Sequence, residues 1–227
     1  MKFPKAIIFD FDGVILESTE IKTQAFLDVF SADKNHLKPI IEYHLNNMGI
    51  SRHEKFRYIY KNILKRDLSH DREKELAKIF SISVWEKILD CPEVPGITNF
   101  LKNYSEICLF FIASGTPEDE LKEVVKKRQL NNYFSGVFGS PKLKPEIIRN
   151  IMKDWNLKAH NMLFIGDAIT DLNAAKECNL PFIGRAASTS NDFTKENINT
   201  IKDFNELIDS SVYCDILKPN IANAKLV

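Results

Sequence analysis

The chain has 227 residues, a formal net charge of zero and 44% hydrophobic residues, among them 16 phenylalanines. This length predicts one large domain, or one domain with a substantial insertion, and enough apolar side chains for a sizeable core. The balanced charge argues against broad binding to nucleic acid or to a membrane surface, because such proteins usually carry a basic excess. No apolar run approaches the length needed to span a membrane.

The cysteines also indicate where the protein works. They lie far apart and form no CxxC pair; they are Cys91, Cys108, Cys178 and Cys214. We expect them to be free, buried thiols, as in a reducing cytoplasm. The first residues lead directly into an apolar run without a signal-peptide pattern, so a cytoplasmic protein is expected.

The first part of the chain contains one strand followed by helices. The run Ala6–Phe9 is rich in Ile and stops at a turn, which predicts a buried strand of a parallel sheet. The next segment shows apolar residues at helical spacing and no clear strand. The expected helices are Thr19–Phe30, Leu37–Leu45, Ser51–Leu64 and Arg72–Leu89. We expect Ser51 to form a capping box with Glu54, and Asp71 to cap the last helix.

Beyond Gly96 the pattern alternates between helix and strand. Helices are expected at Ile97–Asn103, Glu118–Arg128, Pro145–Trp155, Asp171–Cys178 and Phe204–Asp209, and strands at Ile107–Ala113, Val137–Phe138, Met162–Ile165 and Phe182–Ile183. This alternation predicts an α/β fold, a Rossmann-like doubly wound parallel sheet with helices on both faces. The predicted division is a core domain of residues 1–16 and 91–227 and an inserted helical domain of residues 17–90. The tail, residues 211–227, carries no clear pattern.

Two pairs of carboxylates follow two of the predicted strands. Asp10 and Asp12 come directly after the first strand, and Asp167 and Asp171 follow the strand Met162–Ile165. Open α/β sheets bind ligands at the carboxyl ends of their strands, so the two pairs can converge on one hard cation. Oxygen ligands suit Mg²⁺, and no His or Cys lies near either pair, which argues against zinc.

With two further motifs, these pairs resemble the haloacid dehalogenase-like hydrolase superfamily. The motifs are Asp10-x-Asp12-Gly, a strand ending at Ser114, a lysine at 144, and Gly-Asp167-x-x-x-Asp171, in the family's order. The inserted helices match the subgroup with a helical cap, which includes phosphoglycolate phosphatase and β-phosphoglucomutase relatives. The resemblance implies that the cap closes over the active site and helps to select the substrate.

The resemblance also implies roles for the carboxylates. Asp10 would be the nucleophile that forms an aspartyl-phosphate, and Asp12 the general acid and then the base, with a raised pKa. Mg²⁺ would bind the side chains of Asp10 and Asp167 and the backbone carbonyl of Asp12. Asp171 would hold a metal-bound water or position Lys144.

The remaining site residues would bind phosphate. By resemblance, Ser114 and the amide of Gly115 would hydrogen-bond the phosphoryl oxygens. Lys144 would neutralise the phosphate; we favour it over Lys142 and Lys153 because it directly precedes a predicted helix. Arg52 lies in a segment, Gly-Ile-Ser-Arg, that resembles the cap segment of β-phosphoglucomutase binding a distal phosphate. The alternative is an exposed arginine at the start of a helix.

These residues predict a Mg²⁺-dependent phosphatase for a small phosphorylated metabolite, such as a sugar phosphate or a phosphoglycolate-like acid. Dehalogenases of the superfamily lack the second aspartate, so Asp12 favours phosphoryl chemistry. A phosphomutase of the β-phosphoglucomutase type is the alternative, although Lys22 stands where the mutase has a His, and Glu17-Ser18 depart from its usual pair. A non-catalytic binding module is a further alternative, against which the complete motif set argues. Monomer and homodimer both remain open.

Overall fold

A single parallel sheet forms the centre of the protein. The computed structural model describes residues 4–187, 193, 196 and 198–209. Its strands are β1 (Ala6–Phe9), β2 (Leu109–Pro117), β3 (Gly136–Ser140), β4 (Met162–Gly166), β5 (Phe182–Arg185) and β6 (Thr200–Ile201). They are ordered β3-β2-β1-β4-β5-β6, and every described pair is parallel. The predicted fold class is therefore confirmed, and β1, the first strand of the chain, lies in the middle of the sheet.

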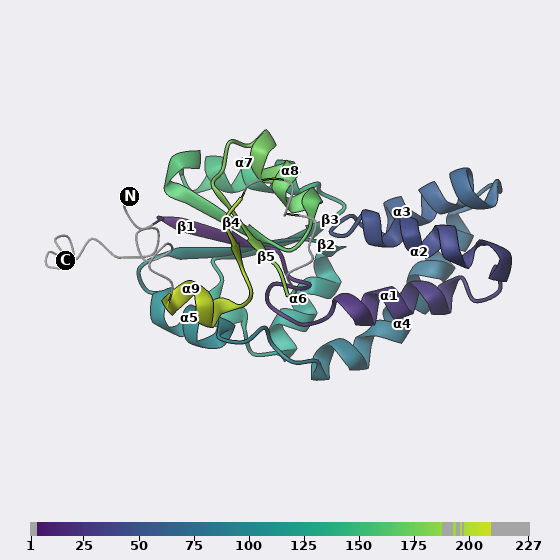
Figure 1. Ribbon diagram of the computed structural model, residues 1–227, viewed down its shortest axis with the longest axis horizontal. Helices are drawn as coiled ribbons and strands as arrows, with labels where there is room; N and C mark the ends of the chain where they lie inside the picture. Colours follow the sequence, from purple (N-terminus) through teal and green to yellow (C-terminus); the bar gives the residue numbers. More distant parts are fainter. Residues whose placement is uncertain (1–3, 188–192, 194–195, 197, 210–227) are drawn as a thin grey trace, which may run out of the picture.

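Helices cover both faces of this sheet and extend beyond one of its edges. They are α1 (Thr19–Val29), α2 (Leu37–Asn46), α3 (Arg52–Tyr58), α4 (His70–Asp90), α5 (Ile97–Tyr104), α6 (Glu118–Lys127), α7 (Lys144–Asp154), α8 (Ile169–Glu177) and α9 (Phe204–Asp209). Figure 1 shows α7 and α8 on one face and α5, α6 and α9 on the other. Helices α1–α4, which we call the cap, lie together beyond the carboxyl ends of the strands. Ligands of such sheets bind at that edge.

Side-chain alternation along β1 explains why both faces are covered. Ala6 and Ile8 belong to the apolar cluster that includes α7 and α8, whereas Ile7 and Phe9 belong to the cluster that includes α5, α6 and α9. The Phe9 ring meets the Phe110 ring edge-on, with centroids 5.3 Å apart. A strand that is apolar at every position needs a helical layer on each side.

The cap has an aromatic centre built from three of its helices. Phe26 of α1 lies 5.6 Å from Phe56 of α3 and 5.2 Å from Phe80 of α4, measured between ring centroids. Phe30, the residue directly after α1, stacks on Phe26 with ring centroids 6.4 Å apart. All four rings are buried, so the apolar stripes of these helices pack against one another.

Local details of the cap differ from the sequence predictions. The helix expected at 51–64 is α3 followed by a π-helix, Ile59–Leu64. Ser51 precedes α3, but its side chain makes no capping hydrogen bond, so the predicted capping box is wrong. Helix α4 begins earlier than expected and is capped by Ser69, whose hydroxyl accepts a backbone N–H bond, rather than by Asp71. Ser and Asp are about equally good N-cap residues, so residue type alone could not show whether Ser69 or Asp71 caps α4.

Three of the cysteines are buried free thiols, as expected: Cys91, Cys108 and Cys178. Cys214 and the tail, residues 211–227, lie outside the described residues. Strand β6 has only two residues and was not predicted, because so short a strand has no alternation to read. In the part of the chain that the structure describes, no helix has both the length and the apolar character needed to cross a membrane.

Candidate active site

Three carboxylates meet where β1 and β4 end. The strands pair in parallel, and the Asp10 N–H donates to the Ile165 carbonyl at 2.9 Å, so Asp10 and Asp167 leave the sheet side by side. Carboxylate oxygens of Asp10, Asp167 and Asp171 all lie within 4.8 Å of one another. Gly13 allows this approach: it has a φ of +74°, and a β-carbon there would lie 2.0 Å from an Asp167 oxygen.

Lys144, the first residue of α7, provides the positive charge of this cluster. Its ammonium lies 3.0 Å from Asp10 Oδ2 and also pairs with Asp171, and all three side chains are buried. The other oxygen of Asp171 accepts the Ala168 N–H at 3.1 Å. Both Asp171 oxygens are thus engaged, and this arrangement fits the positioning of Lys144 better than the holding of a water.

The two rival lysines lie elsewhere. Lys142 is exposed, with its ammonium 6.0 Å from the centre of the Phe138 ring. Lys153 is exposed on the last turn of α7. Of these three, Lys144 is the one that contacts Asp10, in keeping with the position directly before the helix that favoured it in the sequence.

The crowded carboxylates have strongly perturbed acidities. Burial, aided by the charges of Asp171 and Asp12, raises the pKa of Asp10 to about 7, although Lys144 opposes the shift. Burial and the neighbouring Asp10 and Asp171 likewise raise the pKa of Asp167 well above its ordinary value. Burial lowers the pKa of Lys144, but the attraction of Asp10 and Asp171 outweighs it, so the net shift is upward.

Asp12 behaves differently from the prediction. Burial favours its neutral form, yet the Lys22 ammonium and hydrogen bonds from Lys22, Ser18 and Thr116 hold the pKa of Asp12 below its ordinary value. The Ser18 hydroxyl donates to Asp12 at 2.6 Å and the Thr116 hydroxyl at 3.2 Å. The expected raised pKa is therefore wrong for this arrangement, because the sequence did not reveal that Lys22 pairs with Asp12. Asp12 is also outside the cluster of three carboxylates.

The end of β2 supplies the polar groups opposite Asp10. Pairing with β3 changes register between Ala113 and Pro117, and β2 continues past its predicted end. Ser114 is buried; its hydroxyl accepts the Thr116 N–H at 3.2 Å and lies 3.3 Å from the Thr116 hydroxyl. A β-carbon on Gly115 would lie 2.5 Å from the Gly49 carbonyl oxygen of the cap, so only a glycine allows the cap to approach this closely.

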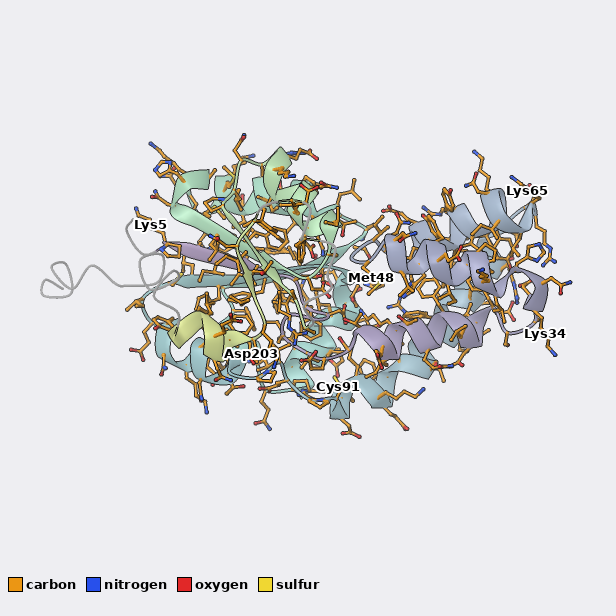
Figure 2. All side chains as sticks on the ribbon, viewed as in Figure 1. Lys5, Lys34, Met48, Lys65, Cys91 and Asp203 are labelled. Carbon is orange, nitrogen blue, oxygen red and sulfur yellow. The ribbon has the colours of Figure 1, made fainter. Side chains whose placement is uncertain are left out.

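The cap contacts the core around this site at two further points. The Thr170 hydroxyl donates to the Met48 carbonyl, and Figure 2 shows Met48 at the junction between the cap and the sheet. Arg52, which was predicted to bind phosphate, instead pairs with Glu120 of α6 at 2.6 Å and is buried. Ser81 of α4 donates to the same carboxylate at 2.9 Å. The alternative prediction for Arg52, an exposed residue, is therefore wrong, while its role toward phosphate stays a prediction.

A small cavity of about 50 Å³ lies between the core and the cap. Core residues Asp10, Asp12, Ser114, Gly115, Thr116 and Asp167 line it together with cap residues that include Lys22, His44, Arg52, Lys55, Phe26 and Phe80. The sequence analysis did not identify Thr116, His44 or Lys55 as site residues. No signal in the sequence marks them, because Thr116 of β2, His44 of α2 and Lys55 of α3 come from elements far apart in the chain and meet only in the folded protein.

The donor set fits a hard divalent cation. Within the described residues, the structure gives the Asp167 carboxylate no hydrogen bond and no ion pair, although it lies beside two other carboxylates. Unpaired charge in such a place is costly, and a cation that binds oxygen relieves it. No His or Cys belongs to the cluster. Asp167 is the carboxylate most available to such an ion, because Lys144 and a backbone N–H contact both Asp171 and Asp10; the N–H on Asp10 is that of Phe11, at 2.7 Å. Asp10 lies beside Asp167, and its oxygens keep further lone pairs for an ion.

Solved structures with the same fold include several hydrolases. A predicted phosphoglycolate phosphatase from Haemophilus somnus aligns with a TM-score of 0.73 and 15% identity, covering 92% of this chain and 97% of that one. CbbY from Rhodobacter sphaeroides, solved with phosphate, aligns with a TM-score of 0.71 and 17% identity, covering 90% and 96%. CbbY has also been solved with xylulose-(1,5)bisphosphate. At these identities the similarity concerns the fold.

Family membership comes from the sequence profile. A search of the curated proteins returned no match to this chain. The profile described as haloacid dehalogenase-like hydrolase matches residues 7–185, a span that holds the Asp10 and Asp12 pair, Ser114, Lys144, Asp167 and Asp171. The span begins in β1 and ends in β5, and it includes the whole cap. The chain therefore belongs to the haloacid dehalogenase-like hydrolase family.

Proposed function

We propose that the protein is a Mg²⁺-dependent phosphatase that hydrolyses a small phosphorylated metabolite through an aspartyl-phosphate intermediate, an acyl phosphate formed on Asp10. One observation carries the proposal: the Asp10 carboxylate is held by Lys144 at 3.0 Å, beside Asp167, in a cavity that Ser114 also lines. Lys144 reduces the repulsion between this nucleophile and a phosphate dianion. A bound Mg²⁺, held by Asp10 and Asp167, would supply further neutralisation of the transferring phosphoryl group.

The first step forms a bond between an Asp10 oxygen and phosphorus and breaks the bond between phosphorus and the ester oxygen. Ser114 and the Gly115 amide hold the phosphoryl oxygens, and the departing alkoxide takes a proton from Asp12. In the second step a water attacks phosphorus, gives its proton to Asp12 and releases phosphate from Asp10. No group is left altered after the two steps.

The Lys22–Asp12 pair bears directly on these proton transfers. In the present arrangement Lys22 keeps Asp12 ionised, which suits the base role in the second step. In the acid role, the substrate oxygen displaces Lys22, and Asp12 then carries a proton. Lys22 is on α1 of the cap and Asp12 follows β1, so this pair couples the cap to the proton donor.

The substrate is proposed to be small and cytoplasmic. A cavity of about 50 Å³ corresponds to roughly three to five water-sized positions, far less than a drug-sized ligand needs. The similar structures described as a phosphoglycolate phosphatase and as CbbY with phosphate or a sugar bisphosphate lend support to a phosphorylated metabolite. No observation favours a monomer over a homodimer.

The test is phosphate release from p-nitrophenyl phosphate by protein stripped with EDTA, with and without added Mg²⁺. Wild type is expected to turn over only with the metal, and Asp10→Asn to lose about 10³-fold or more of kcat/KM. Asp154→Asn, at the exposed end of α7, is the matched control and should behave like wild type.

Turnover that survives Asp10→Asn would contradict the covalent route. Turnover that is independent of divalent cations would contradict the metal's role. If wild type releases no phosphate but interconverts glucose phosphates when a bisphosphate is added, the protein is a mutase that uses the same Asp10 chemistry. Absence of both activities, together with absence of metal binding, would favour a non-catalytic binding module.

A further inference from the structure

Among the residues that the structure describes, Lys55 is a buried cation of the cavity that has no carboxylate partner. Lys55, on α3, is 3% exposed, and within the described residues no carboxylate oxygen lies within 4.0 Å of its ammonium. The other cations that contact the site are all paired: Lys22 with Asp12, Arg52 with Glu120, and Lys144 with Asp10. A buried charge without a counterion is costly, and proteins usually neutralise it with a ligand or by a shift of its pKa.

Hydrogen bonds to His44 hold the Lys55 ammonium in place and leave one of its N–H donors for the cavity. Its ammonium lies 3.1 Å from His44 Nδ1 and 3.3 Å from the His44 carbonyl, and 5.3 Å from the centre of the Phe26 ring. An ammonium has three N–H donors. The structure gives Lys55 two acceptors among the described residues, and Lys55 lines the cavity, so a third donor remains for a molecule bound there.

His44 is held in a form that accepts from Lys55. Burial, followed by the Lys55 and Lys22 charges, lowers the pKa of His44 to about 3, so the ring is neutral. With Nδ1 as the acceptor, the proton is on Nε2, which lies 3.1 Å from the Thr23 hydroxyl. That hydroxyl donates to the Thr19 carbonyl at 3.1 Å. This chain of bonds from α1 through α2 to α3 holds the lysine in place.

From this geometry we infer that Lys55 binds a second anionic group, a carboxylate or a second phosphate, at the end of the substrate away from the phosphate being cleaved. The inference rests on the proposed function, which places the first phosphate at Asp10. Arg52, three residues earlier on the same face of α3, also lines the cavity and is engaged by Glu120. The substrate class is therefore a small phosphate monoester that carries a second negative charge.

The acidity of Lys55 supports this assignment. Burial, with the nearby Lys22 charge, lowers the pKa of Lys55 to about 7. An anion bound next to the ammonium opposes both causes, so the protonated form is restored as the ligand binds.

The experiment compares matched ligands by calorimetry, in the Asp10→Asn variant so that no ligand is consumed. The first pair is 2-phosphoglycolate and ethyl phosphate, which differ by a carboxylate in place of a methyl group. The second pair is 1,3-propanediol bisphosphate and propyl phosphate. We expect the ligand with two anionic groups in at least one pair to bind about 10- to 100-fold more tightly than its partner.

Lys55→Met and Lys55→Gln should bring that ratio close to one, whereas Lys61→Met, an exposed lysine of the same cap segment, should preserve it. A ratio of dissociation constants cancels a general loss of affinity caused by poor folding. The pair whose ratio depends on Lys55 identifies the anionic group as carboxylate or phosphate.

Equal binding within both pairs in the Lys55-containing protein would overturn the inference, and so would a preference that persists in both Lys55 variants. Failure of every ligand to bind would overturn it as well. These results are independent of turnover on p-nitrophenyl phosphate, so a failure of the proposed phosphatase activity can be told apart from a failure of the Lys55 assignment.

Discussion

The buried lysine of the cap makes stability depend on pH in a way that one substitution can test. The ordinary pKa of a lysine is 10.5, and burial lowers that of Lys55 to about 7. Below pH 7 the folded protein must hold the charge inside the cap, which costs about 5 kcal/mol relative to an exposed lysine. Between pH 7 and 10.5 the folded state binds fewer protons than the unfolded state, so this cost shrinks as the pH rises.

Lys55→Met removes the titrating group and keeps a long, apolar side chain. The lost hydrogen bonds to His44 change the free energy of unfolding by an amount that varies little with pH, because burial, the largest cause of the lowered His44 pKa, remains in the variant. Relative to wild type, the variant should therefore have a higher free energy of unfolding at pH 6 than at pH 9. From the two pKa values of Lys55, the expected change in this difference is about 2–3 kcal/mol.

The assay is urea unfolding of wild type, Lys55→Met and the exposed control Lys61→Met at several pH values from 6 to 9, in EDTA and without phosphate. The difference in the free energy of unfolding between wild type and Lys55→Met should shrink steadily as the pH rises from 6 to 9. The difference between wild type and Lys61→Met should stay constant. Parallel curves for wild type and Lys55→Met would refute the reasoning, because they would mean that Lys55 ionises as it does in water.

Three further substitutions test the site and the core. Lys144→Met should lower kcat/KM for p-nitrophenyl phosphate by about 10²- to 10³-fold, because Asp10 loses its cation, while Lys153→Met should leave it unchanged; equal effects would contradict the assignment. Phe9→Ala should reduce the free energy of unfolding in urea by about 3–5 kcal/mol, against less than about 1 kcal/mol for Ile107→Ala, which is 52% exposed. Gly115→Ala should push the cap away and lower kcat/KM about tenfold or more, and unchanged kinetics would mean that cap closure is not needed for turnover.

Much of the fold could be predicted from local patterns. The apolar run of β1 and the alternation of helix and strand patterns after Gly96 indicated a parallel sheet. Apolar residues at helical spacing indicated the helices of the cap. Element ends were less certain, since β2 extends to Pro117 through a change of register that depends on its pairing with β3. The cap helix of residues 51–64 is divided into α and π segments, a difference in backbone hydrogen bonding that apolar spacing does not encode.

The sequence by itself determined that Asp10 and Asp167 lie at one edge of the sheet, because residues that directly follow parallel strands share that edge whatever the loops do; Asp12, which was expected to join them, lies outside the cluster. Asp10 and Asp167 are such residues, and their order with Ser114 and Lys144 marked the family. Only the tertiary structure decided the electrostatics. Lys22 sets the acidity of Asp12, Glu120 engages Arg52, and Lys55 enters the cavity without a counterion among the described residues. Such effects depend on distances of a few ångströms between elements far apart in the chain, and no local pattern of residues specifies them.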